Sequence, residues 1–402
     1  MYTLLRKKLG GLRREVIEFA RELVRTPSLT LEEGLVAEKV RRELELSGYD
    51  KVVSDDFGNV VGIKLGRETK PNLLLISHMD TVGPASAERW ESDPYGAEIR
   101  DGRLYGLGAS DCKGGLAAQV YAGALLSASL LPLRGNLVFA ATVAEGNGRS
   151  VGVRGLLEKT LPDLGITPDY AVLGEPTDLG LYYGHDGWVE LKLVVEGPNP
   201  FHVEDAARTI AENLAVDGPA GEGEPASSAP RFEDLPGARR ATLLMSRRLK
   251  ASIPVGEVVD QVRREAVRAA AGDTAVEVGV QEKRECLYNG RYEIVRNLAN
   301  AWAIDPYDVL VERARQALAA GGAEVRPRRW RLGRLGMGTA GGTLVNDYKI
   351  STVGYGPGNE EVAHSYNEYV EVEKMVEAVY GTAVIAHSLV GIPVFGWTSD
   401  EI

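Results

Sequence analysis

Apolar residues recur at helical spacing through the first 24 residues and then give way to short apolar runs bounded by Gly, Asn and Pro. The first pattern predicts an amphipathic helix with Leu5, Leu9, Leu12, Val16, Ala20 and Leu23 on one face. The later runs predict strands within 59–66, 72–83, 136–143 and 170–177. Helical stretches from Leu116 and Val153 alternate with these strands, which favours an α/β sheet with a parallel portion.

The pattern changes after residue 185. Residues 188–197 alternate apolar and polar side chains, as a half-solvated antiparallel strand does. A Gly-, Pro-, Ser- and Glu-rich segment, 216–237, predicts a long loop, followed by a strand and an amphipathic helix. The α/β pattern returns near Val309. We therefore expect a larger α/β domain formed by 1–185 and 296–402, with 186–295 inserted as a smaller α+β domain.

Composition narrows the possible partners. A chain of 402 residues is long enough for two domains. Its net charge of −11 argues against nucleic acid and anionic membrane as partners, so we expect a small molecule or peptide. Two cysteines, Cys112 and Cys286, are too few for a disulfide framework and fit a reducing cytoplasm. The N-terminal pattern predicts a folded helix, with neither a signal peptide nor a membrane span.

Charged residues end three of the predicted strands, where ligands of α/β sheets usually bind. His78 and Asp80 lie two apart, so on a strand they face the same way. They are either a metal-binding imidazole oriented by a carboxylate or a structural hydrogen-bonded pair. Glu145 and Glu175 end two further strands. Asp111 in a glycine-rich turn and His364 in a late loop each have an ordinary structural interpretation as well, as a helix cap and a solvated histidine.

The order of these motifs is more specific than any one of them. The chain carries, in sequence, His-x-Asp at 78–80, Asp111 before Lys-Gly-Gly, Glu145, Gly-Glu-Pro-Thr at 174–177, and Gly-Pro-Gly at 356–358 followed by His364 and Glu368. This series resembles the co-catalytic zinc metallopeptidase family of succinyl-diaminopimelate desuccinylase, acetylornithine deacetylase, aminoacylase and glutamate carboxypeptidase. The resemblance covers about residues 10–390, and it is greatest to the branch of hydrolases linked to selenium metabolism.

The resemblance implies a zinc-exopeptidase-like three-layer α/β/α catalytic domain with an inserted lid and dimerisation domain, and hence a homodimer. It also implies a first metal held by His78, Glu175 and a bridging Asp111, and a second held by Asp111, His364 and a glutamate. Asp80 matches the carboxylate that orients the first histidine. Zn²⁺ suits these donors, in one or two copies per chain, and Co²⁺ or Mn²⁺ could replace it.

The sequence departs from the family where the catalytic Glu-Glu pair should stand. Aligning residues 142–146 on the family's pattern makes Glu145 the general base and leaves Gly146 in place of a metal ligand. A shift of one residue makes Glu145 the ligand and Ala144 the lost base. The first alignment keeps Thr142 and Val143 in register and is the one we favour.

The remaining candidates concern substrate binding. His202 matches, one residue out of place, the lid histidine that crosses a dimer to stabilise the oxyanion. Arg248 is a candidate clamp for a substrate carboxylate or a solvated strand arginine. Gly338 and Thr339 stand where the family often has Gly-Thr-Ser-Asp. His185 and His387 are assigned to structure.

These observations favour a metal-dependent hydrolase that cleaves the amide bond of an N-acyl amino acid or a short peptide through a metal-activated water. The alternative is a non-hydrolytic homologue that keeps one metal and binds a ligand or partner. A structural dimer with no site is the third possibility.

Overall fold

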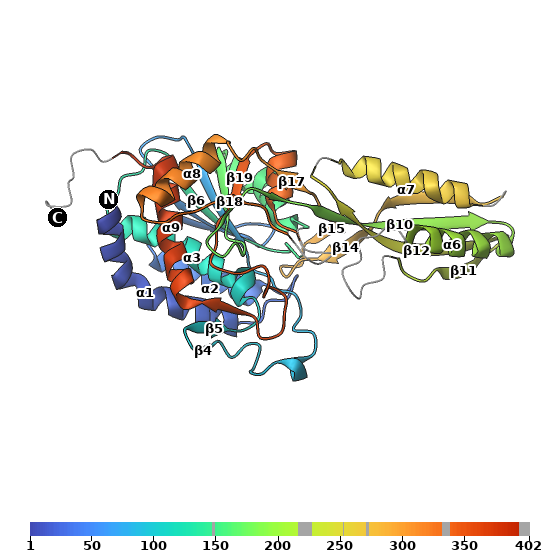
Figure 1. Ribbon diagram of the computed structural model, residues 1–402, viewed down its shortest axis with the longest axis horizontal. Coiled ribbons are helices and arrows are strands. Elements are labelled where there is room, and N and C mark those ends of the chain that lie inside the picture. The colour runs from blue at the N-terminus through green and yellow to red at the C-terminus, as the bar shows by residue number, and fades with distance from the viewer. Residues whose placement is uncertain (147–148, 216–226, 252, 271–272, 332–337, 394–402) are drawn as a thin grey trace.

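The computed structural model describes residues 1–146, 149–215, 227–251, 253–270, 273–331 and 338–393, and shows two bodies side by side (Figure 1). In the larger body, the described residues form an eight-stranded mixed sheet. Its central strands run parallel to one another, whereas β1, β2 and β8 pair antiparallel with a neighbour. The order across the sheet is β1 (Lys51–Ser54), β2 (Val60–Lys64), β6 (Leu137–Thr142), β3 (Leu73–His78), β7 (Tyr170–Leu173), β19 (Ser351–Gly354), β8 (Leu181–Tyr182) and β18 (Pro327–Arg328).

Helices cover both faces of this sheet because its inner strands are apolar on both sides. On β3, Leu73 and Leu75 join one hydrophobic cluster, whereas Leu74 and Ile76 join the other. The first cluster includes residues of α1 (Tyr2–Arg25), α2 (Gly34–Leu46), α3 (Gly114–Ala128), α8 (Val309–Ala320) and α9 (Val372–Val390). The second includes residues of α4 (Val151–Gly155), the helical turns Leu156–Thr160 and Thr343–Asp347, and α5 (Leu161–Asp163). The predicted three-layer α/β/α class is confirmed.

Shorter elements complete the larger body. A three-stranded sheet places β5 (Arg103–Tyr105) between β4 (Glu98–Arg100) and β20 (Tyr369–Glu371). The strand β9 (Gly184–His185) pairs with β17 (Trp302–Ala303) where the chain leaves and re-enters this body. The helix predicted from Leu116 is α3, and it is buried over most of its length, as expected of a core helix. Among the described residues, no helix is both long and apolar enough to cross a membrane.

The smaller body is an antiparallel sheet with two helices, which is the α+β pattern expected of the insert. Side chains of β10 and β12 alternate between buried and partly exposed, and their buried side packs on α6 and α7. The sheet contains β11 (Arg231–Leu235), β12 (Ala238–Leu249), β10 (Gly187–Gly197) and β13 (Ala275–Val280), with β16 (Leu298–Ala299) also paired to β10; the helices are α6 (Pro200–Ala215) and α7 (Val255–Ala269).

The strand β11 was not expected, because its residues fall in the segment predicted to be a loop. Its side chains are mostly exposed and alternate in no apolar pattern, so only pairing with β12 across the turn at Gly237 defines it. Residues 216–226 of that predicted loop lie outside the described residues.

A hairpin of β14 (Glu282–Cys286) and β15 (Tyr292–Arg296) extends from the insert and packs on the larger body. The hydroxyl of Tyr288 donates to the carbonyl of Gly58 at 3.0 Å, and the amide of Asn289 donates to the carbonyl of Asp56 at 2.9 Å. Leu287 and Val295 belong to the hydrophobic cluster of the larger body. The domain boundaries at 186 and 295 stay predictions, because this hairpin belongs to the insert by sequence and to the larger body by packing.

Close backbone packing between α3 and β7 leads to a stability prediction. A Cβ atom on Gly115 would lie 1.7 Å from the carbonyl oxygen of Gly174, so Gly115→Ala must push the two elements apart. We expect Gly115→Ala to lower the unfolding free energy by about 1–3 kcal/mol, measured by chemical denaturation. Gly10→Ala is the matched control: it has no neighbour within 4 Å on the helix α1 and should gain about 0.5–1 kcal/mol. Equal stability of the two variants would contradict this packing.

Candidate metal centre

His78 ends β3 with its two ring nitrogens in different surroundings. The Nδ1 atom lies 2.7 Å from the main-chain oxygen of Asp80, which can only accept, so Nδ1 carries a proton. The Nε2 atom faces Asp111 Oδ1 at 3.2 Å and Glu175 Oε2 at 3.9 Å. Burial lowers the pKa of His78, but the acidic groups of Cys112, Glu175 and Asp111 raise it well above its usual value. This nitrogen is therefore oriented toward a cluster of anionic donors.

Asp111 lies between two imidazoles. Its Oδ1 faces His78 and its Oδ2 lies 2.8 Å from Nε2 of His364, which comes from a loop more than 250 positions later in the chain. Burial raises the pKa of Asp111, yet the two histidines outweigh it and hold that pKa below its usual range. A carboxylate that reaches two imidazoles with separate oxygens has the geometry of a bridging ligand.

Glu368 holds the turn that presents Asp111. Its carboxylate accepts three main-chain N–H groups, from Gly108 at 3.0 Å, Ser110 at 2.8 Å and Asp111 at 2.9 Å. Burial raises the pKa of Glu368 to about 7. The glycines of the 356–358 motif serve the same purpose: a Cβ on Gly358 would lie 2.1 Å from the carbonyl oxygen of Ser110, so only glycine lets these loops approach.

Glu175 follows β7 and is buried beside His78 and Asp111. Burial raises its pKa well above the usual value, and the Asp111 carboxylate adds to that rise although His78 opposes it. The thiol of Cys112 donates to the carbonyl of His78 at 3.4 Å. One donor atom from each of His78, Asp111, Cys112 and Glu175 lies within 4.8 Å of all the others. The structure thus brings together the sequence-predicted donors and adds a sulfur.

Two buried carboxylates hold the backbone that carries Glu145. The Glu145 and Gly146 amides donate to Asp80 at 3.2 and 2.9 Å, and the Ala144 amide donates to Glu33 Oε1 at 2.9 Å. The Asp80 carboxylate was expected to orient His78, but its nearer oxygen is 3.7 Å from Nδ1, and the main-chain oxygen of Asp80 takes that hydrogen bond instead. The carboxylate of Asp80 therefore fixes the 145–146 backbone.

The side chain of Glu145 is buried and only partly paired. Ser150 donates to its Oε1 at 3.3 Å, whereas none of the described residues provides a hydrogen-bond partner for Oε2. Burial raises the pKa of Glu145 to about 8, with His78 lowering it and Asp80 raising it. Ala144, the other candidate position for a carboxylate, lies in the hydrophobic cluster of the larger body. Because the surroundings of Ala144 are apolar, they do not suit a catalytic carboxylate, and this favours the alignment in which Glu145 is the base.

Gly146 stands where that alignment lacks a metal ligand. A Cβ there would lie 3.0 Å from Cγ2 of Thr30 and 3.6 Å from Oδ2 of Asp80. A side chain at this position would therefore first meet the Thr30 side chain, methyl group included, and then the Asp80 carboxylate that supports the loop.

A small cavity of about 30 Å³ joins these groups, and its lining includes His78, Asp111, Glu145, Glu175, His364, Gly338 and Thr339. A volume of this size has room for a water molecule. Thr339 is held by the buried His185, whose Nε2 accepts from the Thr339 amide at 3.0 Å. Burial lowers the pKa of His185 to about 4, so this imidazole is neutral and structural, as expected.

His202 and Arg248 do not line this cavity. His202 lies on α6 in the smaller body, where its half-exposed ring pairs with Asp273 at 2.6 Å. Arg248 lies on β12 opposite Trp188 and is partly exposed. Sequence reasoning also missed residues that shape the site, among them Glu33, Thr30, Trp330 and Glu360. Glu33 directly precedes the helix α2, so in the sequence it resembles the acidic residues that are common at helix starts.

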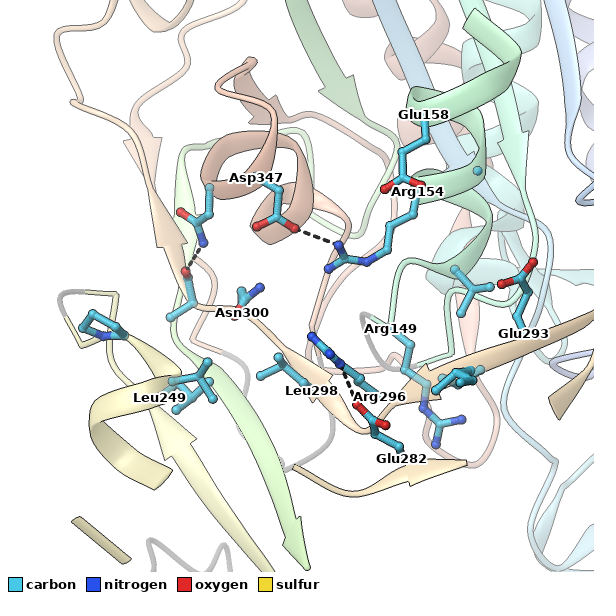
Figure 2. Close-up of a pocket in the computed structure, with 18 of the residues that line it drawn as sticks. Arg149, Arg154, Glu158, Leu249, Glu282, Glu293, Arg296, Leu298, Asn300 and Asp347 are labelled. Carbon is cyan, nitrogen blue, oxygen red and sulfur yellow. Dashed lines mark hydrogen bonds and ion pairs between the residues drawn. The ribbon is translucent and has the colours of Figure 1, made fainter. Parts of the chain in front are cut away.

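A larger hollow of about 1030 Å³ lies between the two bodies (Figure 2), and the described residues that line it do not include the candidate metal ligands. Two of its arginines form ion pairs: Arg154 contacts Asp347 at 3.0 Å and Arg296 contacts Glu282 at 2.8 Å. Arg149 lies nearer the loop of Glu145 and contacts Glu285 at 3.7 Å. The candidate metal ligands His78, Asp111, Glu175 and His364 line the smaller cavity and not this hollow.

The donors of the smaller cavity fit a zinc-type divalent cation. Imidazole, carboxylate and thiol are the groups that bind Zn²⁺ in proteins. Glu145, whose Oε2 lacks a hydrogen-bond partner among the described residues, lines the same cavity as His78, Asp111 and Glu175. His78, Asp111, Glu175 and His364 would hold the cation. A cation would also offset the repulsion between carboxylates that burial otherwise makes costly.

Comparison with known proteins agrees with this fold. Residues 74–387 match the model of Peptidase family M20/M25/M40, and the chain belongs to that family. It is similar to "Uncharacterized protein YgeY" of Escherichia coli K12, with 32% identity over 49% of this chain and 47% of that one. It is also similar to a succinyl-diaminopimelate desuccinylase of Gluconacetobacter diazotrophicus, with 35% identity over 45% and 49% of the two chains. The matches thus span about half the length of these curated relatives.

Solved structures share the fold over nearly the whole chain. The dipeptidase Dug1p of Saccharomyces cerevisiae matches with a TM-score of 0.67 and 15% identity, over 97% of this chain and 98% of that one. The YXEP protein of Bacillus subtilis, described as a dinuclear metal-binding peptidase, matches with a TM-score of 0.67 and 17% identity, over 94% and 98%. At these identities the likeness shows the architecture alone.

The support of the Glu145 loop leads to a pH prediction for the metal-free protein. Burial, followed by the charge of Asp80, raises the pKa of Glu33 from 4.5 to about 7. The folded state therefore holds the proton more tightly than the unfolded state, and the unfolding free energy falls as pH rises through this window. Glu33→Gln removes that loss, so its unfolding free energy relative to wild type should rise by about 2–3 kcal/mol between pH 4.5 and 7.

Denaturation of chelator-treated protein at several pH values measures this difference. The adjacent Glu32 is exposed, so Glu32→Gln should follow the wild-type curve throughout. Parallel curves for Glu33→Gln and wild type would show that Glu33 is not a buried titrating group.

Proposed function

We propose that this chain is a metal-dependent hydrolase that cleaves the amide bond of an N-acyl amino acid or a short peptide. The observation that supports this most is that Glu145, one of whose carboxylate oxygens has no hydrogen-bond partner among the described residues, lines the cavity in which Asp111 lies between two imidazoles. The family's named members in the comparisons, a desuccinylase and a dipeptidase, are consistent with amide substrates.

A divalent metal, Zn²⁺ in our proposal with Co²⁺ or Mn²⁺ as substitutes, would supply Lewis acidity toward the scissile carbonyl and lower the pKa of water. In this proposal Glu145 takes a proton from the attacking water and returns it to the leaving nitrogen, as the water oxygen replaces nitrogen on the carbonyl carbon. Asp80 and Glu33 keep Glu145 in place through the backbone of residues 144–146.

Substrate contacts in this proposal come from both bodies. Gly338 and Thr339 line the cavity and would contact the substrate from the larger body. The cavity of about 30 Å³ is too small for an acyl amino acid, so the bulk of the substrate must lie outside it. His202 and Arg248 lie on the smaller body and do not line the cavity of their own chain. In the proposed homodimer, His202 would reach the substrate of the second copy of the chain.

The role of Glu145 can be separated from metal binding. Glu145→Gln keeps the size of the side chain but cannot accept the proton, so hydrolysis should fall by about 10²–10⁴-fold. Metal content, measured by elemental analysis after purification without chelator, should stay at the wild-type value. Glu324→Gln, at a side chain 85% exposed, is the control and should retain both.

A panel of N-acyl amino acids and dipeptides provides the substrates for this comparison. A lower metal content in Glu145→Gln would instead make Glu145 a ligand. A wild-type chain that holds metal but cleaves no member of the panel would favour the non-hydrolytic alternative.

The proposed dimer predicts complementation between two inactive variants. His202→Ala should lose about a hundredfold in turnover with unchanged metal content, as expected for a missing oxyanion donor. After unfolding and refolding as a mixture, His202→Ala and Glu145→Gln should regain roughly a quarter of wild-type activity. Half of the random dimers are then mixed, and each mixed dimer has one site with both residues intact. No gain on mixing would remove His202 from the partner's site.

A further inference from the structure

Cys112 directly follows the bridging Asp111 and is fully buried. Its sulfur belongs to the group of four donor atoms, with His78, Asp111 and Glu175, that lie within 4.8 Å of one another. The thiol donates its hydrogen bond to the carbonyl of His78, the residue whose Nε2 faces the same group. The side chain is thus directed toward the donors of the candidate metal centre.

A buried cysteine usually acts as a small apolar side chain within a core. Cys112 differs, because it belongs to none of the three hydrophobic clusters that the described residues form. Its surroundings are an imidazole and two carboxylates. The second cysteine, Cys286, is exposed on β14 and lies apart from this group, which makes it a natural control.

We propose that Cys112 is a further ligand of the metal centre, binding a thiophilic divalent cation such as Zn²⁺ or Co²⁺ through its thiolate. A metal–sulfur bond forms as the S–H bond breaks, the proton passes to the buffer, and no electron is transferred. The inference rests on the metal centre of the proposed function, and it adds a donor to that centre without changing the reaction.

The geometry requires only a small contraction. Donor atoms around a tetrahedral zinc ion are about 3.3–3.8 Å apart, given bonds of about 2.0 Å to nitrogen and 2.3 Å to sulfur. The His78 nitrogen and the Asp111 oxygen are already 3.2 Å apart, and the outer limit of the group is 4.8 Å. Reaching these spacings shortens any pair of donor atoms by about 1.5 Å at most. The thiolate also brings a negative charge that Gly146 cannot supply.

Soft sulfur donors favour zinc over the harder manganese and magnesium ions, so a Cys112 ligand should increase the preference of the site for Zn²⁺ over Mn²⁺. Cys112→Ser should weaken Zn²⁺ binding by more than about tenfold, the lower end of what the loss of even an outer partner costs a metal site. Binding of Mn²⁺ should change much less. An equal change for both ions would contradict a thiolate ligand.

Cobalt substitution tests the sulfur directly. The Co²⁺-loaded wild type should show an intense near-ultraviolet thiolate-to-cobalt charge-transfer band. Cys286→Ser should keep this band, and Cys112→Ser and Cys112→Ala should lose it while still binding cobalt. Absence of the band from fully loaded wild type, or its loss in Cys286→Ser alone, would overturn the assignment.

X-ray absorption at the zinc edge can be measured without replacing Cys112. It therefore tests the proposal even if Cys112→Ser and Cys112→Ala fail to fold. The Zn²⁺-loaded Cys286→Ser chain should show one sulfur neighbour at about 2.3 Å. A spectrum with nitrogen and oxygen neighbours alone would overturn the thiolate ligand and leave the hydrolase proposal standing. If the sulfur neighbour is present but no substrate is hydrolysed, the thiolate ligand stands and the hydrolase proposal is overturned.

Discussion

The carboxyl edge of the main sheet is governed by the cost of burying carboxyl groups close together. Six of them lie buried around one small cavity, and each must be neutralised, hydrogen bonded or compensated by a cation. Burial is the first cause of a raised pKa for most of them, whereas Asp111 is kept ionised by two imidazoles. The six are Glu33, Asp80, Asp111, Glu145, Glu175 and Glu368.

The six divide into two groups by their partners. Glu33, Asp80 and Glu368 accept main-chain N–H groups and so set the course of two loops. Asp111, Glu145 and Glu175 point toward the histidines and the cavity, where backbone partners for their side chains are few. The carboxyl groups of the first group support the loop backbones, and those of the second can ionise together only if a cation offsets their repulsion. The same loss of solvent that penalises the second group strengthens its attraction to a metal.

Much of this arrangement follows from sequence patterns. The strands ending in His78, Glu145 and Glu175 are short apolar runs, and parallel strands that end at one edge bring their last residues together. The sequence patterns do not predict the contacts that depend on loop backbone conformation or on packing between residues far apart in the chain. The support of Ala144 by Glu33 joins residues 111 positions apart, and the direction of Cys112 depends on a tight turn. The strand β11 carries no apolar periodicity, so only its pairing reveals it.

The hairpin β14–β15 has a mechanical consequence for the two bodies. Tyr288 packs so closely over Gly58 that a Cβ there would lie 2.5 Å from its ring, and the hairpin is therefore anchored to the larger body. Only Gln281 separates it from β13 of the smaller sheet, and Gln281 is itself bonded to the Glu190 and Asn297 backbones. Gln281 therefore joins the anchored hairpin to β10 and to the residue that follows β15 through main-chain hydrogen bonds. The smaller sheet is thus tied to the larger body by the packing of this hairpin as well as by the covalent chain.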